Sequence, residues 1–318
     1  MNGNAKGKVL ITEVVHPVLQ TELSNAGFEC LHLEKTTYSE VLQIIDRYCG
    51  LVVRSKIKVD RQLIDKGKQL RFIGRTGSGM ELIDVEYATQ KGITCLNSPE
   101  GNCNSVAEHA TGMLLCLLHN VVKADAELRH CQWKRVENTG FELMGKTVGI
   151  IGYGNTGSAF ARRLKSFGVK ILAYDKYKSG FGSRGITETT LNTIFEHADV
   201  VSLHVPLTPQ TRHWVNSYFI AQFKKPVYLI NTSRGEVLNT PHVIEALYNG
   251  KLRGVALDVF ENEDLATYTA AEHNWLEQLC RHPKTVITPH IAGVTHEATY
   301  KMAAILAKKI IHHATSNL

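Results

Sequence analysis

The sequence lacks the features that would place the protein in a membrane or on an export route. No segment comes near the ~18 uninterrupted apolar residues of a membrane-spanning helix. The start, Met1–Lys8, is polar and has neither a long apolar run nor a small-residue cleavage site, so no secretory signal is expected. We therefore predict a soluble cytoplasmic protein without a membrane partner.

Cysteine and excess charge are also too scarce to define a function. The seven cysteines are an odd number and contain no C-x-x-C pair, which favours free thiols in a reducing compartment over disulfides or zinc. No histidine pair has metal-ligand spacing with an acid nearby, so no metal is expected. The 36 basic residues exceed the 30 acidic ones by too little to indicate nucleic acid, although the excess suits an anionic substrate.

Short apolar, β-branched runs alternate with helical patterns along almost the whole chain. Such runs are typical of parallel strands covered by helices on both faces, which indicates an α/β protein. The expected strands form two sets. The first is Val9–Val15, Cys30–Leu33, Leu51–Arg54, Phe72–Gly74 and Ile93–Leu96, and the second is Val148–Gly152, Lys170–Tyr174, Val200–Val205, Val227–Asn231, Gly254–Val259 and Val286–Thr288.

A long helical stretch separates the two sets and marks a boundary between two sheets. Ser105 is expected as its N-cap, with Glu108 completing a capping box, and apolar residues continue to Val122. The last segment, about His296–His313, also has helical spacing. We predict two Rossmann-like, doubly wound parallel-sheet domains with the active site in the cleft between them.

A glycine-rich turn follows the first strand of the second set. In the motif G-x-G-x-x-G, Gly152 permits a tight turn, Gly154 lets the backbone approach a pyrophosphate, and Gly157 lets the next helix pack closely. Asp175 ends the following strand, where a carboxylate accepts hydrogen bonds from ribose hydroxyls and repels a 2′-phosphate. This pattern predicts a dinucleotide site that prefers NAD to NADP. His204, at the end of a later strand, is expected to shape the cofactor pocket.

Three later segments each end or follow an expected strand and carry acid–base groups. They bring Arg234, an acid from the segment Asp258–Glu263, and His290 to the carboxyl edge of one sheet. A histidine can take the proton of a secondary alcohol, and an acid paired with it fixes the ring. A guanidinium can clasp a carboxylate. These groups suit hydride transfer between a nicotinamide cofactor and a hydroxy acid.

At these residues the chain resembles the D-isomer-specific 2-hydroxyacid dehydrogenase family over essentially its full length. The resemblance implies that Arg234, Glu263 and His290 are catalytic. It also implies a substrate domain of flavodoxin-like fold (residues 1–100 plus 295–318) and an NAD-binding Rossmann domain (residues 101–294). The family's long segment between the glycine turn and the active site often forms a dimer interface, so a homodimer is expected.

The resemblance also implies the cofactor and substrate contacts. Besides the glycine turn (Gly152, Gly154, Gly157), the implied NAD contacts are Ser78, Asn155, Thr156, Asp175, Val205, Pro206, Thr211, Thr232, Ser233, Arg234, Asp258, His290 and Gly293. The implied substrate contacts are Arg54, Arg75, Gly77, Ser78, Gly79, Arg234 and, from a partner subunit, Arg135.

Within the family, the sequence is most similar to D-3-phosphoglycerate dehydrogenases, which implies a role in serine biosynthesis. In that subgroup the residues matching Arg54 and Arg75 face the phosphate. The chain departs from the subgroup at Glu81-Leu82 and at Glu263-Asp264. Because the sequence stops at Leu318, the regulatory domains of many such enzymes are expected to be missing. Glycerate, hydroxypyruvate, glyoxylate and lactate therefore stay open as substrates. The alternative function of another class is that of a protein that binds NAD(H) as a sensor.

Overall fold

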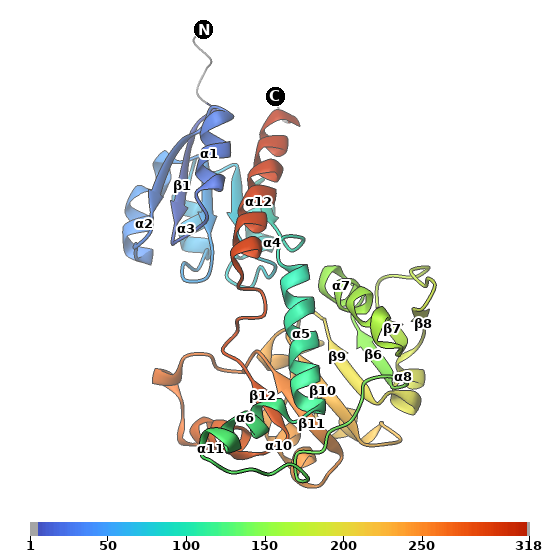
Figure 1. Ribbon diagram of the computed structural model, residues 1–318. Helices are drawn as coiled ribbons and strands as arrows, with labels where there is room; N and C mark the ends of the chain where they lie inside the picture. Colours follow the sequence, from blue (N-terminus) through green and yellow to red (C-terminus); the bar gives the residue numbers. More distant parts are fainter. Residues whose placement is uncertain (1–5, 317–318) are drawn as a thin grey trace. The chain divides into compact units, whose positions relative to one another are not determined.

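The computed structural model describes residues 6–316 (Figure 1). Residues Met1–Ala5, on which part of the secretory-signal prediction rests, lie outside the described residues, as do residues 317–318. Within residues 6–316, no helix has both the length and the apolar character needed to cross a membrane. Across the same range, no three His, Cys, Asp or Glu side chains are arranged to hold a metal ion. All seven cysteines are free thiols.

The chain folds into two compact units. The first takes residues up to Cys103 and from Val294 onward, and the second is Asn104–Gly293. Within the described residues, the first unit therefore has two parts, and the second unit is inserted between them.

The first unit is built on a parallel sheet of five strands in the order β2-β1-β3-β4-β5. Its strands are β1 (Lys8–Thr12), β2 (Glu29–Leu33), β3 (Gly50–Val53), β4 (Phe72–Arg75) and β5 (Thr94–Asn97). Its helices are α1 (Val18–Asn25), α2 (Tyr38–Ile44), α3 (Arg61–Lys66), α4 (Val85–Gln90) and α12 (His296–Ser316).

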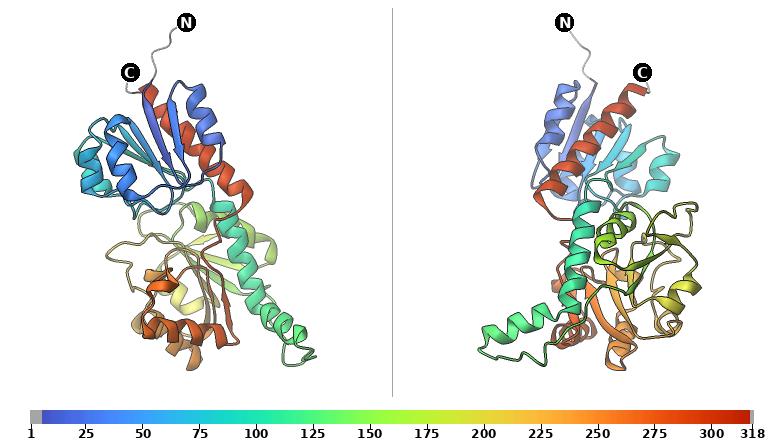
Figure 2. Two further views of the ribbon diagram at one scale, coloured as in Figure 1. Left: turned by 90° about the vertical axis from the view of Figure 1, so that its left-hand side faces the viewer. Right: turned by 45° about the vertical axis from the view of Figure 1, so that its right-hand side comes forward.

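Alternation of side chains along β1 gives this sheet two buried faces. Val9 and Ile11 pack in a core with residues of α1 and α12, whereas Leu10 packs on the opposite side with residues of α2, α3 and α4. The helix α12 lies beside α1 although the two are far apart in sequence (Figures 1 and 2). Its Leu306 and Ile310 fill the space left by Gly74 of β4. The last helix therefore completes one face of the first sheet.

The second unit has a parallel sheet of seven strands in the order β12-β11-β10-β9-β6-β7-β8. Its strands are β6 (Thr147–Ile151), β7 (Lys170–Tyr174), β8 (Thr187–Glu188), β9 (Val200–Leu203), β10 (Val227–Asn231), β11 (Leu252–Leu257) and β12 (Thr285–Ile287). Its helices are α5 (Cys103–Leu118), α6 (Val121–Arg129), α7 (Asn155–Leu164), α8 (Leu191–His197), α9 (Ser217–Ala221), α10 (Thr240–Tyr248) and α11 (Ala270–Arg281).

The predicted fold class of two parallel-sheet α/β domains is confirmed, and each expected strand overlaps an observed one. The boundary helix differs from its prediction. It begins at Cys103, so Ser105 is not the N-cap; its hydroxyl donates to the Ala292 carbonyl at 2.8 Å. The helix also stops before Asn120, whose φ of 54° is left-handed and turns the chain into α6.

Candidate active site

The predicted catalytic segments come together at the carboxyl edge of the second sheet. Arg234 follows β10, Asp258 follows β11 and His290 follows β12. These three strands are neighbours in the sheet, so the loops after them lie side by side. In an open parallel sheet this edge forms the ligand site.

The structure pairs the predicted acid with the predicted histidine. His290 Nδ1 lies 2.7 Å from Glu263 Oε2. The side chains are 47% and 42% exposed, so the pair is reachable from solvent. With Nδ1 engaged by the carboxylate, Nε2 is the ring atom left to face a substrate. Glu263, rather than Asp258, is therefore the acid that holds the ring.

Asp258 instead holds the backbone on which His290 sits. It is almost fully buried, at 1% exposure. Its carbonyl accepts the N–H of His290 at 2.7 Å, and its two carboxylate oxygens accept the N–H groups of Ile291 and Ala292 at 2.9 Å each. His290 has a φ of 53°, a left-handed conformation that is uncommon outside glycine. The Asp258 bonds hold the turn in this conformation.

The glycine turn has the geometry of a phosphate site. Gly152 has a φ of 94°, and a Cβ on it or on Gly157 would collide with backbone carbonyls. A Cβ on Gly154 would meet nothing within 4 Å, so the surface beside it is open. Because Gly154 is the N-cap of α7 and has no side chain, the first N–H groups of the helix, from Asn155 and Thr156 on, point toward this open side without a side-chain cap.

Other predicted cofactor residues line the same edge of the second sheet. Asp175 accepts the N–H of Tyr153 at 2.7 Å and of Tyr177 at 2.9 Å, which fixes its carboxylate beside the glycine turn. The hydroxyl of Thr232, after β10, is buried without a hydrogen-bond partner among the described residues. Such an orphaned group is typical of a site that a ligand completes. The remaining members at this edge are Val205, Pro206 and Thr211 after β9, Ser233 after β10, and Gly293 at the end of the unit, whereas the predicted contact Ser78 belongs to the first unit.

His204 supports the glycine turn from inside. Its backbone lies against Gly152, its ring is near Phe160 with 5.4 Å between ring centroids, and its Nε2 is 2.9 Å from the hydroxyl of Ser202. Burial lowers the pKa of His204 from 6.5 to about 3. The ring is therefore a neutral part of the core under the predicted cofactor loop.

This buried histidine predicts acid sensitivity. Between pH values of about 6.5 and 3 the unfolded chain binds a proton at His204 that the folded chain does not bind. The free energy of unfolding should therefore fall as the pH falls below about 6.5, by on the order of 1 kcal/mol per pH unit. Urea unfolding across this range should give a flatter profile for His204→Gln than for the unchanged protein. Parallel profiles would contradict the assignment.

The predicted acid-binding residues belong to the first unit. Arg54 follows β3, and Arg75 ends β4 just before the turn Gly77-Ser78-Gly79. The Arg75 side chain is 15% exposed; its Nε donates to the Arg54 carbonyl at 2.9 Å, and its Nη1 donates to the Gly79 carbonyl. Arg75 thus ties the ends of two neighbouring strands together. Its predicted contact with a phosphate stays a prediction.

Glu13, which no sequence motif marks, anchors the loop Arg54–Lys56. Glu13 follows β1 and is 5% exposed. Its carboxylate accepts the N–H groups of Arg54, Ser55 and Lys56 at 2.9–3.0 Å. Burial alone raises the pKa of Glu13, but these backbone donors outweigh it and the net pKa is lowered. The only sequence signal is an acid directly after the first strand.

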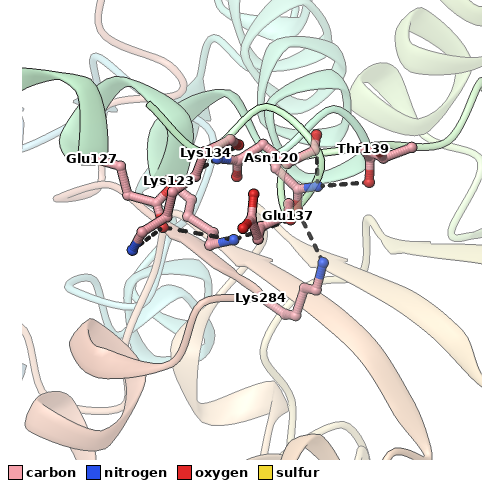
Figure 3. Close-up of polar contacts among 8 residues, drawn as sticks. Asn120, Lys123, Glu127, Lys134, Glu137, Thr139 and Lys284 are labelled. Atoms are coloured by element: carbon pink, nitrogen blue, oxygen red, sulfur yellow. Dashed lines mark hydrogen bonds and ion pairs between the residues drawn. The ribbon is translucent and has the colours of Figure 1, made fainter. Parts of the chain in front are cut away.

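The helix α6 and the return segment to residue 144 form an arm of the second unit (Figure 2). Arg135 belongs to this arm and is exposed. Hydrogen bonds and ion pairs connect α6 to the return segment (Figure 3). Glu127 accepts Asn138 Nδ2 at 2.6 Å and pairs with Lys123 and Lys134. The hydrogen bond from Asn138, together with the two lysines, lowers the pKa of Glu127.

The arm is also attached to the second sheet. Lys284 Nζ donates to Asn120 Oδ1 at 3.0 Å, which joins the residue before α6 to the residue before β12.

The sequence match over this unit decides the family. Residues 111–292 match the D-isomer specific 2-hydroxyacid dehydrogenase family, NAD binding domain. The chain belongs to that family. The matched region contains the glycine turn, Arg234, Glu263 and His290.

Curated relatives of this dehydrogenase family differ in their substrates. The chain is 39% identical over 279 residues to a hydroxypyruvate reductase of Thermotoga maritima, covering 88% of each chain. It is 38% identical over 306 residues to a D-3-phosphoglycerate dehydrogenase of Methanocaldococcus jannaschii, covering 95% of this chain and 56% of that protein. The chain thus spans little more than half the length of the phosphoglycerate dehydrogenases that it matches.

Solved structures support the same family and its cofactor. A D-lactate dehydrogenase from Aquifex aeolicus, complexed with NAD and lactic acid, has a TM-score of 0.83 and 29% identity, and the match covers 97% of this chain and 96% of that one. The residues described above fit NAD. The open glycine turn and the N-terminus of α7 suit a pyrophosphate, Asp175 suits the ribose hydroxyls, and Thr232 offers an unpartnered hydroxyl.

Proposed function

We propose that the protein is an NAD-dependent dehydrogenase that interconverts a D-2-hydroxy acid and its 2-keto acid. The observation that carries this proposal is the 2.7 Å pair of His290 Nδ1 and Glu263 Oε2 at the carboxyl edge of the family's NAD-binding domain. In this proposal residues 101–294 bind NAD, and residues 1–100 with 295–318 bind the acid.

In this proposal three side chains have separate roles in the reaction. In the oxidation, His290 Nε2 takes the proton of the substrate hydroxyl, and in the reduction it returns that proton to the carbonyl oxygen. Glu263 orients the ring through Nδ1 and compensates the charge that the ring gains. Arg234 clasps the substrate carboxylate and polarises the neighbouring carbonyl. NAD, when bound, accepts the hydride in one direction and, when reduced, donates it in the other.

The proposed substrate is D-3-phosphoglycerate, oxidised to 3-phosphohydroxypyruvate in serine biosynthesis. Support comes from the phosphoglycerate dehydrogenases that match nearly the whole chain, and from Arg54 and Arg75 at adjacent strand ends of the first unit. Hydroxypyruvate, reduced to D-glycerate, is the second candidate, because the hydroxypyruvate reductase matches this chain over 88% of both lengths.

A substrate panel tests this proposal directly. NADH absorbance is followed with NAD plus D-3-phosphoglycerate, D-glycerate or D-lactate, and with NADH plus hydroxypyruvate or glyoxylate. Preference for phosphoglycerate supports the phosphate assignment, and preference for an unphosphorylated acid replaces it. Binding of NADH without turnover of any acid would contradict the dehydrogenase proposal and favour an NAD(H) sensor.

The role of Arg54 can be separated from general damage to the first unit. Arg54→Gln is expected to lower kcat/KM for phosphoglycerate at least ~tenfold while changing that for D-glycerate much less, because only the former offers a dianion. Arg61→Gln is the matched control, since Arg61 is an exposed arginine of the same unit that pairs with Asp84. Equal losses of kcat/KM for both substrates would show that Arg54 does not bind the phosphate.

We further propose that the arm forms a homodimer interface that carries Arg135 toward a partner's substrate. The helix α6 buries none of its residues. Trp133 and Val136 are each 81% exposed, and Leu128, Phe141 and Met144 add further exposed apolar surface. Large exposed apolar side chains on an arm that is held by internal hydrogen bonds and ion pairs are typical of an interaction surface.

The dimer proposal predicts a change of mass on mutation of the arm. Sedimentation of the unchanged protein should give a dimer, and Trp133→Glu with Val136→Glu should give a monomer. Tyr218→Glu is the control, because Tyr218 is 82% exposed on α9, away from the arm. A protein that sediments as a monomer without any mutation, or a dimer that survives both arm mutations, would contradict the proposal.

A further inference from the structure

The helix α5 is attached at three points to the segment that carries His290. At one end, Ser105 Oγ donates to the Ala292 carbonyl at 2.8 Å. In the middle, His109 Nε2 lies 3.0 Å from Thr288 Oγ1. At the far end, Asn120, just beyond the helix, accepts Lys284 Nζ at 3.0 Å (Figure 3). The segment from β12 to the His290 turn is thus fixed along one helix.

The central attachment connects to the buried carboxylate of Asp258. Thr288 Oγ1 lies 2.6 Å from Asp258 Oδ1. A carboxylate only accepts, so the single hydroxyl proton of Thr288 goes to Asp258. Thr288 must then accept from His109, which makes His109 Nε2 the donor. His109 Nε2 also lies 3.5 Å from Asp258 Oδ1.

The same Asp258 holds the left-handed turn of His290. Its carboxylate binds the N–H groups of Ile291 and Ala292, and its carbonyl binds that of His290. We propose that His109 is a positioning residue: by donating to Thr288 it orients Asp258 and so fixes the backbone turn that presents His290. This inference rests on the proposed function, in which His290 transfers the proton.

The chemistry of the network explains why a hydrogen-bond donor is needed at position 109. Without it, Thr288 can turn its hydroxyl away from Asp258, and the carboxylate loses one of the bonds that fix its direction. The His290 turn then loosens, because a left-handed non-glycine residue persists only where its surroundings enforce it. Loosening misplaces the proton-transfer group but leaves the glycine turn and Asp175 untouched. The expected effect is therefore on kcat rather than on NADH binding.

Two substitutions at position 109 separate positioning from packing. His109→Phe keeps an aromatic ring at the position but removes the hydrogen-bond donor, whereas His109→Gln keeps a donor on a side chain of different shape. We expect His109→Phe to lower kcat roughly tenfold, with the Kd of NADH changed by less than about twofold. His109→Gln should stay within about threefold of the unchanged protein. The control is His119→Phe, because His119 is an exposed residue next to the same helix.

Hydrogen exchange supplies a readout that does not depend on turnover. In the protein with NADH bound, amides 290–292 should exchange faster in His109→Phe than in the His119→Phe control, and His109→Gln should resemble the control. An unchanged kcat and exchange rate in His109→Phe, or a His109→Gln as impaired as the phenylalanine variant, would overturn the inference. If the unchanged protein turns over no acid, the proposed function fails, while the exchange result still decides whether His109 fixes the turn.

Discussion

His290→Ala is expected to lower kcat by roughly three orders of magnitude, because positioned acid–base groups commonly contribute that much. The ring is the proposed proton carrier, and it is oriented by Glu263 and held on a turn anchored by Asp258. NADH binding should be almost unchanged, since the glycine turn and Asp175 lie on the loops after β6 and β7, not after β12. Steady-state kinetics and NADH fluorescence titration measure the two effects separately.

A matched substitution controls for general damage by loss of a histidine. His197→Ala removes a ring that is 48% exposed on α8 of the same unit, and it should leave kcat unchanged. A near-normal kcat in His290→Ala would remove His290 from the acid–base role. Loss of NADH binding together with kcat would instead point to collapse of the cofactor domain.

Arg234→Gln is expected to lower kcat/KM by roughly two to three orders of magnitude, because kcat falls and KM rises. A guanidinium that clasps the substrate carboxylate contributes to binding, and its pull on the carbonyl contributes to the chemical step. Hydrogen bonds with Asn231 hold the backbone of this segment. Asn231 Nδ2 donates to the Arg234 carbonyl at 2.8 Å, and Asn231 Oδ1 accepts the N–H of Ser233 at 3.0 Å.

Arg234→Lys tests whether planar, two-point recognition matters. Lysine keeps the charge but cannot form two parallel N–H bonds, so it should recover only a part of the activity that glutamine loses. The kinetics of keto-acid reduction with NADH are the measurement, and Arg212→Gln, an exposed arginine that pairs with Glu236, is the control. Full activity in Arg234→Gln would exclude the carboxylate role.

The common location of His290 and Arg234 was predictable because strand ends and residue chemistry indicate the same edge of the sheet. His290 and Arg234 each follow an apolar run, and parallel strands bring such positions together whatever the details of the loops. The choice of Glu263 over Asp258 was different. Both acids follow β11 in sequence, so residue chemistry alone left the choice open, and only the resemblance to the family named Glu263. In the structure the Glu263 carboxylate contacts the His290 ring, whereas that of Asp258 accepts backbone N–H groups.

Glu13 and His109 were not predictable because their partners are far away in sequence. Glu13 binds backbone N–H groups 41–43 residues further on, and His109 bonds to Thr288 across 179 residues. Backbone donors leave no mark in a side-chain pattern. The break of the boundary helix at Asn120 was missed for a related reason, since a left-handed asparagine looks like any polar residue in a helical repeat.

The return of α12 to the first sheet has a consequence for how the protein is made. On the ribosome, α1 and β1 emerge early, but the face they share with α12 stays uncovered until residues 296–316 follow. The whole inserted unit, Asn104–Gly293, is synthesised in between and has its own core with which to fold. One face of β1 is thus among the last surfaces of the first unit to be covered. Chaperones that bind exposed apolar surface should therefore bind the nascent chain at the β1 and α1 segments of the first unit.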